Sequence, residues 1–492
     1  MLIDSQVIET VRLITVMIVA LYSISVIIFI IMENRSPQST FAWMFLFFIL
    51  PIGGLLIYLL FGRDWKAFSR ANKLTRQELG GDFYRALTRQ LSQEDAVIAN
   101  LEKTSKTAYK RKLLKLAQSN SNSTLTTHNC LEILQDAAEK YPRLIEDIEQ
   151  AQVFIHLEYY IWASDDFTKT LKDILIKKVK EGVEVRVLYD PIGSFFDLSW
   201  AYIREMRAGG IKMYPFSSIY LFHTIGYRNH RKIAIIDGKI GYAGGLNMGQ
   251  EHLDGGRSFN SWRDTHIRVV GEAATSLHTI FVVDWYNATQ EKLSTPIYFP
   301  PLPSEVKDTY TPVQITTSGP DSQWQAIRQL YFFMILAAER YVYLQSPFFV
   351  VDASVADALK AAALAGVDVK LMLAPRGASY QVPYWAGNTY VKEMAEAGVR
   401  IFFYQKGYFH PKTVIIDSEI CAIGSANMDI RSFSINYEVN TLIYDKHIAT
   451  QLTQDFFKDM ANCTEFDLEA YEESHFLLRL RDSVARLFSP LL

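Results

Sequence analysis

The chain has little of what marks several common classes of protein. Only three of its 492 residues are cysteine, at positions 130, 421 and 463. They are far apart, so neither a disulfide framework nor a C-x-x-C metal site is indicated, and free thiols in a reducing compartment are the simplest interpretation. Lys and Arg number 50 against 53 Asp and Glu, which gives a net charge of −3. No overall basic field therefore points to a nucleic-acid partner.

Metal and nucleotide motifs are missing as well. The ten histidines include no H-E-x-x-H or other close grouping of ligands, so the sequence predicts no metal. No P-loop or dinucleotide fingerprint appears, and we expect no cofactor. Hydrophobic residues, by contrast, make up 49% of the chain, which suggests a membrane segment attached to a globular body.

Two long runs near the amino terminus contain no charged residue. Residues 13–32 and 41–61 each have about the length that a helix needs to cross a bilayer, so they predict a transmembrane hairpin. The first run lacks the basic segment and cleavage site of a signal peptide. Five Lys and Arg residues follow the second run within 63–76, whereas the turn has only Arg35. The positive-inside rule therefore predicts a multi-pass protein of the cell membrane with its body in the cytoplasm.

The rest of the chain divides into a connector and a duplicated body. Residues 66–125 are typical of a polar helical connector, ending in a flexible stretch at 119–123. The body repeats one pattern of strands, helices and Gly-Val turns in halves 126–310 and 311–465, which predicts an α/β sandwich in each half. Residues 466–492 have apolar residues at helical spacing with arginines among them, which fits either an interfacial helix or a helix packed on the body.

One stretch occurs in both halves. The first copy is HRKIAIID at 230–237, followed by GGLN at 244–247. The second is HPKTVIID at 410–417, followed by GSAN at 424–427. The apolar, partly β-branched residues between Lys and Asp predict a buried strand. Side chains two residues apart on a strand point to the same face, so the His and Lys of each copy share one surface.

These residue types suit phosphodiester chemistry. Imidazole acts as a nucleophile or a general acid/base near neutral pH, Lys binds a phosphate oxygen, and Asp can orient a catalytic His. Two such sets supply a nucleophile, a proton donor and positive charge. We therefore expect these catalytic residues: His230, Lys232, Asp237, His410, Lys412 and Asp417.

Further polar residues near the motifs are expected to contact substrate. They are Asn247, Ser425, Asn427 and Glu438. The first motif has Gly245 where the second has Ser425, so a hydroxyl contact to phosphate at that position can come from one half only. Glu438 and Asp264 follow the two motifs, and each either supports a His or Lys of the opposite half or belongs to a structural ion pair.

The paired motif resembles the duplicated H-x-K-x₄-D signature of the phospholipase D superfamily, and within it the chain resembles the bacterial cardiolipin synthases. The resemblance also covers residues 35–63, the segment HLEYYIW at 156–162 and SGPD at 318–321. Two halves related by a pseudo-twofold axis are expected to bring His230 and His410 into a single site.

The resemblance implies a two-step reaction on phosphatidylglycerol that yields cardiolipin and glycerol. One histidine attacks phosphorus to form a phosphatidyl-histidine, and the other protonates the departing glycerol and then deprotonates the second phosphatidylglycerol. We expect His230 to be the nucleophile and His410 the acid/base, although the internal symmetry leaves the reverse assignment open. The expected partners are these lipids and the bilayer, without nucleic acid.

Other functions share parts of this pattern. A phospholipase D that releases phosphatidate uses the same motifs and differs only in its acceptor. A phosphatidylserine synthase of the superfamily is a further alternative, but that function would not lead us to expect the hairpin. A catalytically silent membrane scaffold would not need two intact His-Lys-Asp sets. Transfer to a lipid requires a water-poor route, and the aromatic stretches 195–200 and 219–222 are expected either to form an apolar mouth or to pack in the core. The sequence leaves open the oligomeric state and whether phosphatidylethanolamine can replace one phosphatidylglycerol.

Overall fold

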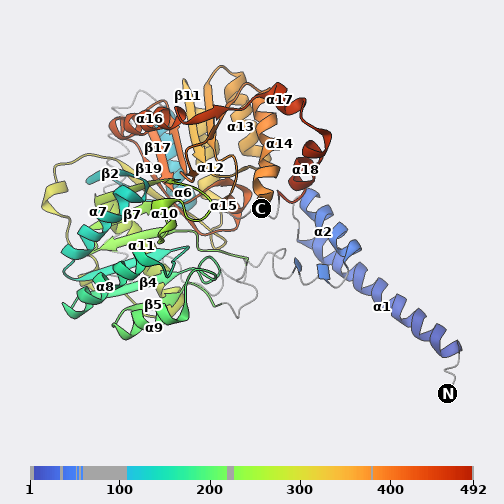
Figure 1. The fold of residues 1–492 in the computed structure, drawn as a ribbon, viewed down its shortest axis with the longest axis horizontal. Coiled ribbons are helices and arrows are strands. Elements are labelled where there is room, and N and C mark those ends of the chain that lie inside the picture. Colours follow the sequence, from blue (N-terminus) through green and yellow to red (C-terminus); the bar gives the residue numbers. More distant parts are fainter. Residues whose placement is uncertain are drawn as a thin grey trace. The chain divides into compact units, whose positions relative to one another are not determined.

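The computed structural model describes residues 5–33, 37–50, 53–54, 57–58, 108–218, 226–377 and 381–489. The chain divides into a small unit, Met1–Phe68 with Tyr220–Gly226, and a large unit, Ser69–Ile219 with Tyr227–Leu492. Figure 1 shows the ribbon of both, and each unit is described by itself.

Two apolar helices make up most of the described part of the small unit. Helix α1 runs over Ser5–Met32 and helix α2 over Pro37–Ile49. By length and composition, Arg12–Met32 within α1 is long and apolar enough to cross a membrane. The second predicted span, 41–61, is described only in part, and its end lies outside the described residues. A small buried cluster consists of Ile30, Trp43, Phe47 and Tyr58.

The predicted connector, 66–125, is described only from residue 108, and its end differs from the prediction. Helix α6 (Ala108–Ser121) packs on α12 (Ala326–Ala337) of the second half. The amide of the buried Asn120 donates to the Gln329 side chain at 3.2 Å. The expected flexible stretch is therefore held against the body at Asn120, whose side-chain amide makes this contact.

A seven-stranded mixed sheet forms the first half. In order across the sheet, its strands are β2 (Asn129–Gln135), β9 (Thr265–Gly271), β7 (Ile240–Gly244), β6 (Lys232–Ile236), β3 (Phe154–Tyr159), β4 (Glu184–Tyr189) and β5 (Lys212–Pro215). β3, β4 and β5 are parallel, whereas β6 pairs antiparallel with β3 and β7. Its main helices are α7 (Asp136–Gln150), α8 (Asp166–Lys180), α9 (Trp200–Ala208) and α11 (Glu272–Thr289), and α10 (Glu251–Asp254) is a single turn.

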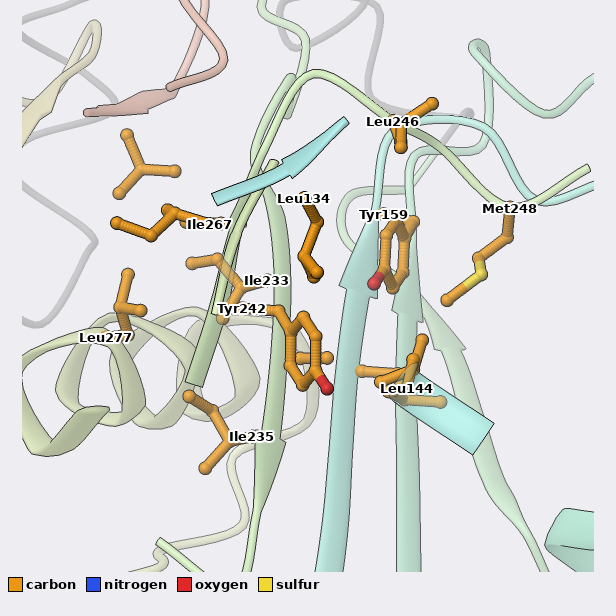
Figure 2. Close-up of a cluster of buried hydrophobic side chains, with 14 of the residues drawn as sticks. Leu134, Leu144, Tyr159, Ile233, Ile235, Tyr242, Leu246, Met248, Ile267 and Leu277 are labelled. Carbon is orange, nitrogen blue, oxygen red and sulfur yellow. The ribbon is translucent and has the colours of Figure 1, made fainter. Parts of the chain in front are cut away.

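Alternation along β6 decides which side chains face the helix α11. Ile233 and Ile235 point to the side of the sheet where Leu277 of α11 lies, and Tyr242 of β7 points to the other side (Figure 2). The lysine that begins β6 shares the Tyr242 face by the same alternation. The apolar run of the motif is thus buried on both faces, as the sequence predicts.

The second half repeats this arrangement in a nine-stranded sheet. In order, its strands are β1 (Leu125–Thr126), β10 (Val313–Ser318), β19 (Glu438–Ile443), β17 (Ile420–Gly424), β16 (Thr413–Ile416), β11 (Tyr341–Ser346), β13 (Asp368–Leu373), β14 (Arg400–Tyr404) and β20 (Cys463–Glu465). The run β19-β17-β16-β11-β13-β14 matches β9-β7-β6-β3-β4-β5 of the first half, so the predicted duplication of an α/β fold is confirmed. Its helices include α12, α13 (Ala353–Leu364), α14 (Val382–Glu396), α15 (Ile430–Ser434) and α16 (Lys446–Met460), followed by α17 (Leu468–Glu472) and α18 (Phe476–Arg486).

Short pairings beside the motifs join the two halves. Strand β8 (Trp262–Arg263) pairs in parallel with β15 (Tyr408–Phe409), and an isolated bridge joins Asn229 to Tyr437. The backbone amide of His230 donates to the Tyr437 carbonyl at 2.9 Å. The backbone that directly precedes each motif is therefore held in place by the opposite half.

Candidate active site

The two motifs have the same backbone geometry in their respective halves. Lys232 begins β6 and Lys412 directly precedes β16, so the histidine of each motif lies just before a central strand. The backbone amide of His230 is fixed by Tyr437, and that of His410 donates to the Arg263 carbonyl at 2.8 Å. The predicted sharing of one face by His and Lys follows from this position.

The motif aspartates lie at the far end of these strands, and this corrects their expected role. Asp237 and Asp417 have φ angles of 51° and 55° in the turns that follow β6 and β16. Five residues of extended chain place each of them roughly 16 Å from its own lysine, out of reach of the histidine. The Asp237 carboxylate accepts backbone N–H bonds from Gln152, Val153 and Phe154 at 2.8–2.9 Å.

Asp417 does the same in the second half. Its carboxylate accepts backbone N–H bonds from Glu339, Arg340 and Tyr341 at 2.8–2.9 Å. The two aspartates therefore anchor the starts of β3 and β11 instead of orienting the histidines.

The carboxylates that do hold the histidines come from the opposite halves. His230 Nδ1 lies 3.0 Å from Glu438 Oε1, at the start of β19. His410 Nδ1 lies 2.7 Å from Asp264 Oδ2, between β8 and β9. Both carboxylates are fully buried. Of the two alternatives that the sequence leaves for Glu438 and Asp264, support of the opposite half's histidine is confirmed.

The position that differs between the motifs shapes these carboxylates. Ser425 donates its hydroxyl to Glu438, and the backbone amide of Val439 donates to the Ser425 oxygen at 3.0 Å. A Cβ at Gly245 would lie 2.0 Å from Asp264 Oδ1, so glycine leaves the space that this carboxylate occupies. The expected contact of Ser425 with phosphate is thus replaced by a contact with Glu438.

Both motif lysines are buried ammonium donors. Each Nζ donates to the carbonyl of the histidine two residues earlier, at 2.6 Å, which leaves further N–H donors on Lys232 and Lys412. Burial lowers the pKa of Lys232 to about 7 and that of Lys412 to about 8. The Lys412 ammonium contributes to the lowering at Lys232 across the boundary between the halves, so both lysines bear on one site.

Burial lowers the pKa of both motif imidazoles below its ordinary value. Burial, and then the nearby Lys412 ammonium, lower the pKa of His410 to about 3, although Asp264 opposes them. Burial lowers the pKa of His230 as well, against the pull of Glu438. Since each Nδ1 faces a carboxylate, the Nε2 atom is the one left for a substrate.

The two motif asparagines differ. Asn247 Oδ1 accepts the backbone N–H of Ile161 at 3.2 Å, so this side chain holds the loop after β3. Asn427 Oδ1 is buried and has no hydrogen-bond partner within the described part of the chain. Among the polar residues expected to contact substrate, Asn427 therefore has unused hydrogen-bonding capacity, whereas Asn247 is engaged.

The residues that fix the approach to the first motif were not anticipated. Asp190, directly after β4, accepts hydrogen bonds from the Arg228 guanidinium at 3.0 Å and from the backbone N–H of Asn229 at 2.9 Å. The Asn229 side chain donates to Glu158 at 2.6 Å. The available signal was that Arg228 and Asn229 directly precede His230 in the sequence.

A further histidine also escaped prediction. His252 of α10 is buried, its ring stands edge-on to Trp262 at 4.4 Å, and Trp262 packs on His410 at 5.3 Å. Neither ring nitrogen of His252 has a hydrogen-bond partner among the described residues. An imidazole with two unused nitrogens thus lies one ring away from His410. Within the same residues, no group of three or more His, Cys, Asp or Glu side chains is arranged to hold a metal ion.

The first aromatic stretch lies on the surface. Phe196 is 88% exposed, and Phe195 and Trp200 are exposed beside it, so packing in the core is excluded for these three aromatic side chains. Its base is tied to the site, because Asp190 also accepts the backbone N–H groups of Ile192 and Gly193 at 2.9 Å. The second stretch, 219–222, lies outside the described residues.

Comparison with known proteins agrees with this geometry. Residues 144–285 and 331–460, more than half of the chain, match a family model described as cardiolipin synthase, phospholipase D-like domain. The chain belongs to the cardiolipin synthase family. Residues 18–63 match a second model, described as phospholipase D-nuclease N-terminal, which covers the second part of α1 and all of α2.

Relatives are similar over nearly the whole length. A cardiolipin synthase of Geobacillus kaustophilus (strain HTA426) is 41% identical over 94% of this chain and 90% of its own. The major cardiolipin synthase ClsA of Bacillus subtilis (strain 168) is 38% identical over 95% and 96%. The crystal structure of a phosphatidylserine synthase from Haemophilus influenzae Rd KW20 covers 77% of this chain and matches along its full length, with a TM-score of 0.58 and 13% identity, so it shares the fold.

Proposed function

We propose that the protein is a cardiolipin synthase, which transfers a phosphatidyl group from one phosphatidylglycerol to another and releases glycerol. The observation that carries the proposal is the pair of histidines, each held at Nδ1 by a carboxylate of the opposite half. Two activated imidazoles in one buried site supply the nucleophile and the proton carrier that a double displacement needs.

In the first step, Nε2 of one histidine attacks phosphorus. The bond from phosphorus to the glycerol oxygen breaks, and the other histidine, which takes up a proton when the anionic phosphodiester binds beside it, gives that proton from Nε2 to the oxygen. In the second step, the hydroxyl of the second phosphatidylglycerol loses its proton to the same acid/base histidine as its oxygen attacks phosphorus. The bond from phosphorus to nitrogen then breaks, which frees the nucleophile and leaves cardiolipin.

We assign His230 as nucleophile and His410 as acid/base. The support is the different condition of the two carboxylates. Asp264 faces His410 at 2.7 Å and shares its charge with one backbone amide, that of Thr265. Glu438 shares its charge among His230, the Ser425 hydroxyl and the Asn436 side-chain amide, which donates to Oε1 at 3.5 Å. The less divided anion stabilises an imidazolium better, which suits the residue that carries a proton.

Lys232 and Lys412 hold the phosphoryl oxygens, and Asn427 supplies a further hydrogen bond. The support is that both lysines have N–H donors beyond the one used on a carbonyl, and that Asn427 is buried without a partner for Oδ1 among the described residues. Buried ammonium groups stabilise the charge of the transition state more strongly than exposed ones, because little water screens them.

The exposed aromatic residues form the mouth through which lipids enter. Phe195, Phe196 and Trp200 present apolar surface to the outside, and Asp190 links the base of their loop to the backbone before His230.

The body lies on the cytoplasmic side, supported by the Lys and Arg residues that follow the second predicted span. In sealed vesicles of known orientation, the exposed Cys130 should react with an impermeant thiol reagent only from the cytoplasmic face.

A product assay tests the reaction. Purified protein in vesicles of phosphatidylglycerol, with a chelator and without nucleotide, should yield cardiolipin and glycerol in equal amounts. The His230→Ala variant should yield neither, whereas His447→Ala, which changes an exposed histidine of α16, should match the unaltered protein. Phosphatidate as the sole product would replace the proposal by a hydrolase, and the absence of any lipid product would favour a scaffold.

A further inference from the structure

The last described helix, α18, presents its apolar residues to the outside. Leu480 is 45% exposed and Leu487 is 73% exposed. A surface helix of a globular body normally buries such a stripe. The exposed apolar side chains that share one side of α18 and the turn after it are Phe476, Leu477, Leu480, Val484, Leu487 and Phe488.

Polar contacts hold α18 in this inverted position. Its buried residues are Asp482 and Ala485. The Asp482 carboxylate accepts hydrogen bonds from Asn388 of α14 at 3.0 Å and from the Tyr471 hydroxyl at 3.3 Å. Because a buried carboxylate loses these bonds if the helix turns, the apolar side is fixed outward.

The neighbouring helix extends the apolar surface. Val382 and Trp385 of α14 line an apolar groove of about 350 Å³ together with Leu477, Leu480, Val484 and Phe488 of the α18 segment. We call these side chains, with Phe476 and Leu487, the α18 surface.

Arginines flank this surface. The Arg481 guanidinium, which pairs with Asp482 at 2.7 Å, lies 4.9 Å from the centre of the Trp385 ring. Arg486, which pairs with Glu393, lies 4.4 Å from the centre of the Tyr390 ring. Arg479 is exposed on α18. Long basic side chains beside an apolar stripe suit the boundary of an anionic bilayer, where the stems contact apolar groups and the guanidinium groups reach phosphates.

We propose that the α18 surface lies in the interfacial region of an anionic bilayer. A helix of 11 residues is about 16 Å long and roughly 10 Å wide. The face that it presents is therefore far smaller than the roughly 800 Å² that each partner buries in a stable protein interface. A lipid surface makes no such demand, since the helix sinks only about 5–10 Å into it. The inference deepens the proposed function by naming the surface on which the site works, yet its test does not require turnover.

Fluorescence quenching by nitroxide lipids tests the proposal on the full chain in vesicles rich in phosphatidylglycerol. Cys130 and Cys463, which are at least partly exposed, are first changed to Ser so that they do not take up the label. The buried Cys421 is kept. Single cysteines then replace Leu480 or Leu487 and carry an environment-sensitive fluorophore. A matched control carries the fluorophore at Lys177 of α8, whose side chain is 73% exposed.

The labels at 480 and 487 should lose more than about half of their fluorescence to a nitroxide high on the acyl chain, and the label at 177 should lose little. The same result is expected in a His230→Ala background, so a failure of the proposed reaction is distinguishable from a failure of membrane contact. Adding Val484→Asp and Leu477→Asp, both at exposed positions, should abolish the quenching at 480. Labels at 480 and 487 that stay unquenched would overturn the proposal.

Discussion

The two motif regions of the large unit share strand order, turn geometry and the lysine-to-carbonyl contact, yet they hold their histidines differently. In one, His230 faces a glutamate that also accepts a serine hydroxyl. In the other, His410 faces an aspartate, and the glycine at the position matching that serine leaves room for the aspartate side chain. The duplicated backbone therefore supplies symmetry of position, and a few side chains supply a difference in chemistry. A double displacement needs this difference, because one imidazole must bond to phosphorus while the other carries a proton.

Removing each histidine in turn should show the difference most strongly. His230→Ala and His410→Ala should each lower transfer from phosphatidylglycerol on the order of 10⁴-fold. A donor with a nitrophenolate leaving group needs no protonation, so His410→Ala should regain a burst of nitrophenolate, whereas His230→Ala should not. The measurement is stopped-flow absorbance. A burst in His230→Ala alone would reverse the assigned roles.

A serine at the matching position of the first motif should displace Asp264, the carboxylate that holds His410. In Gly245→Ser, the new Cβ meets Asp264, which must move away from His410. The loss of an oriented carboxylate should lower kcat roughly 10³-fold. The control is Gly249→Ala, whose Cβ would meet its nearest neighbour at 3.3 Å. Thermal unfolding of both variants separates misfolding from loss of activity, and an active, folded Gly245→Ser protein would contradict the role given to Asp264.

The two lysines predict a basic limb in the pH profile. Their pKa values of about 7 and about 8 are lowered by burial, so each loses its positive charge as pH rises through its pKa. kcat/KM, which reports the free enzyme, should therefore fall across this range, since a neutral amine attracts phosphate weakly. Lys232→Arg keeps its charge at all these pH values and should move the onset of the fall from about 7 to about 8. A profile that stays flat to pH 9 would show that neither lysine acts as a titrating phosphate ligand.

Removing the serine hydroxyl should have a smaller effect than adding one. Ser425→Ala takes one hydrogen bond from Glu438 and leaves its contact with His230, so kcat should fall roughly 10-fold. Burial opposes the ionised form of Glu438, whose pKa is held down by His230 and Lys232 and then by this serine. Ser434→Ala, which removes a hydroxyl bound only to a carbonyl within α15, is the matched control. A loss as large as that of Gly245→Ser would mean that Ser425 contacts the substrate directly.

The sequence alone predicts the strands, the duplication and the meeting of the two motifs, because periodicity and internal repetition are local signals. The partners of the histidines are harder to assign, since Glu438 and Asp264 lie 208 and 146 residues from the side chains they hold. The stretch at 119–123 is polar enough to predict a flexible segment, and only the distant Gln329 shows that Asn120 is fixed. Likewise, the orientation of α18 depends on Asn388, 94 residues from Asp482. Long-range polar pairs of this kind leave no periodic trace in a sequence.

The motif aspartates give the smallest expected effect on catalysis and the most direct test of the corrected geometry. Asp237→Asn and Asp417→Asn keep one acceptor oxygen but lose the charge that faces three backbone N–H groups. Each should lower the free energy of unfolding by about 1–3 kcal/mol, because backbone donors at the start of β3 or β11 lose a charged acceptor. Activity per folded molecule should stay within about two-fold of the unaltered protein, since roughly 16 Å separates these carboxylates from the site. Thermal unfolding in detergent and kcat on the folded fraction measure the two effects separately. A fall in kcat without a fall in the unfolding temperature would return the aspartates to the chemistry, whereas equal destabilisation in both halves would show that the duplication preserved them for the fold.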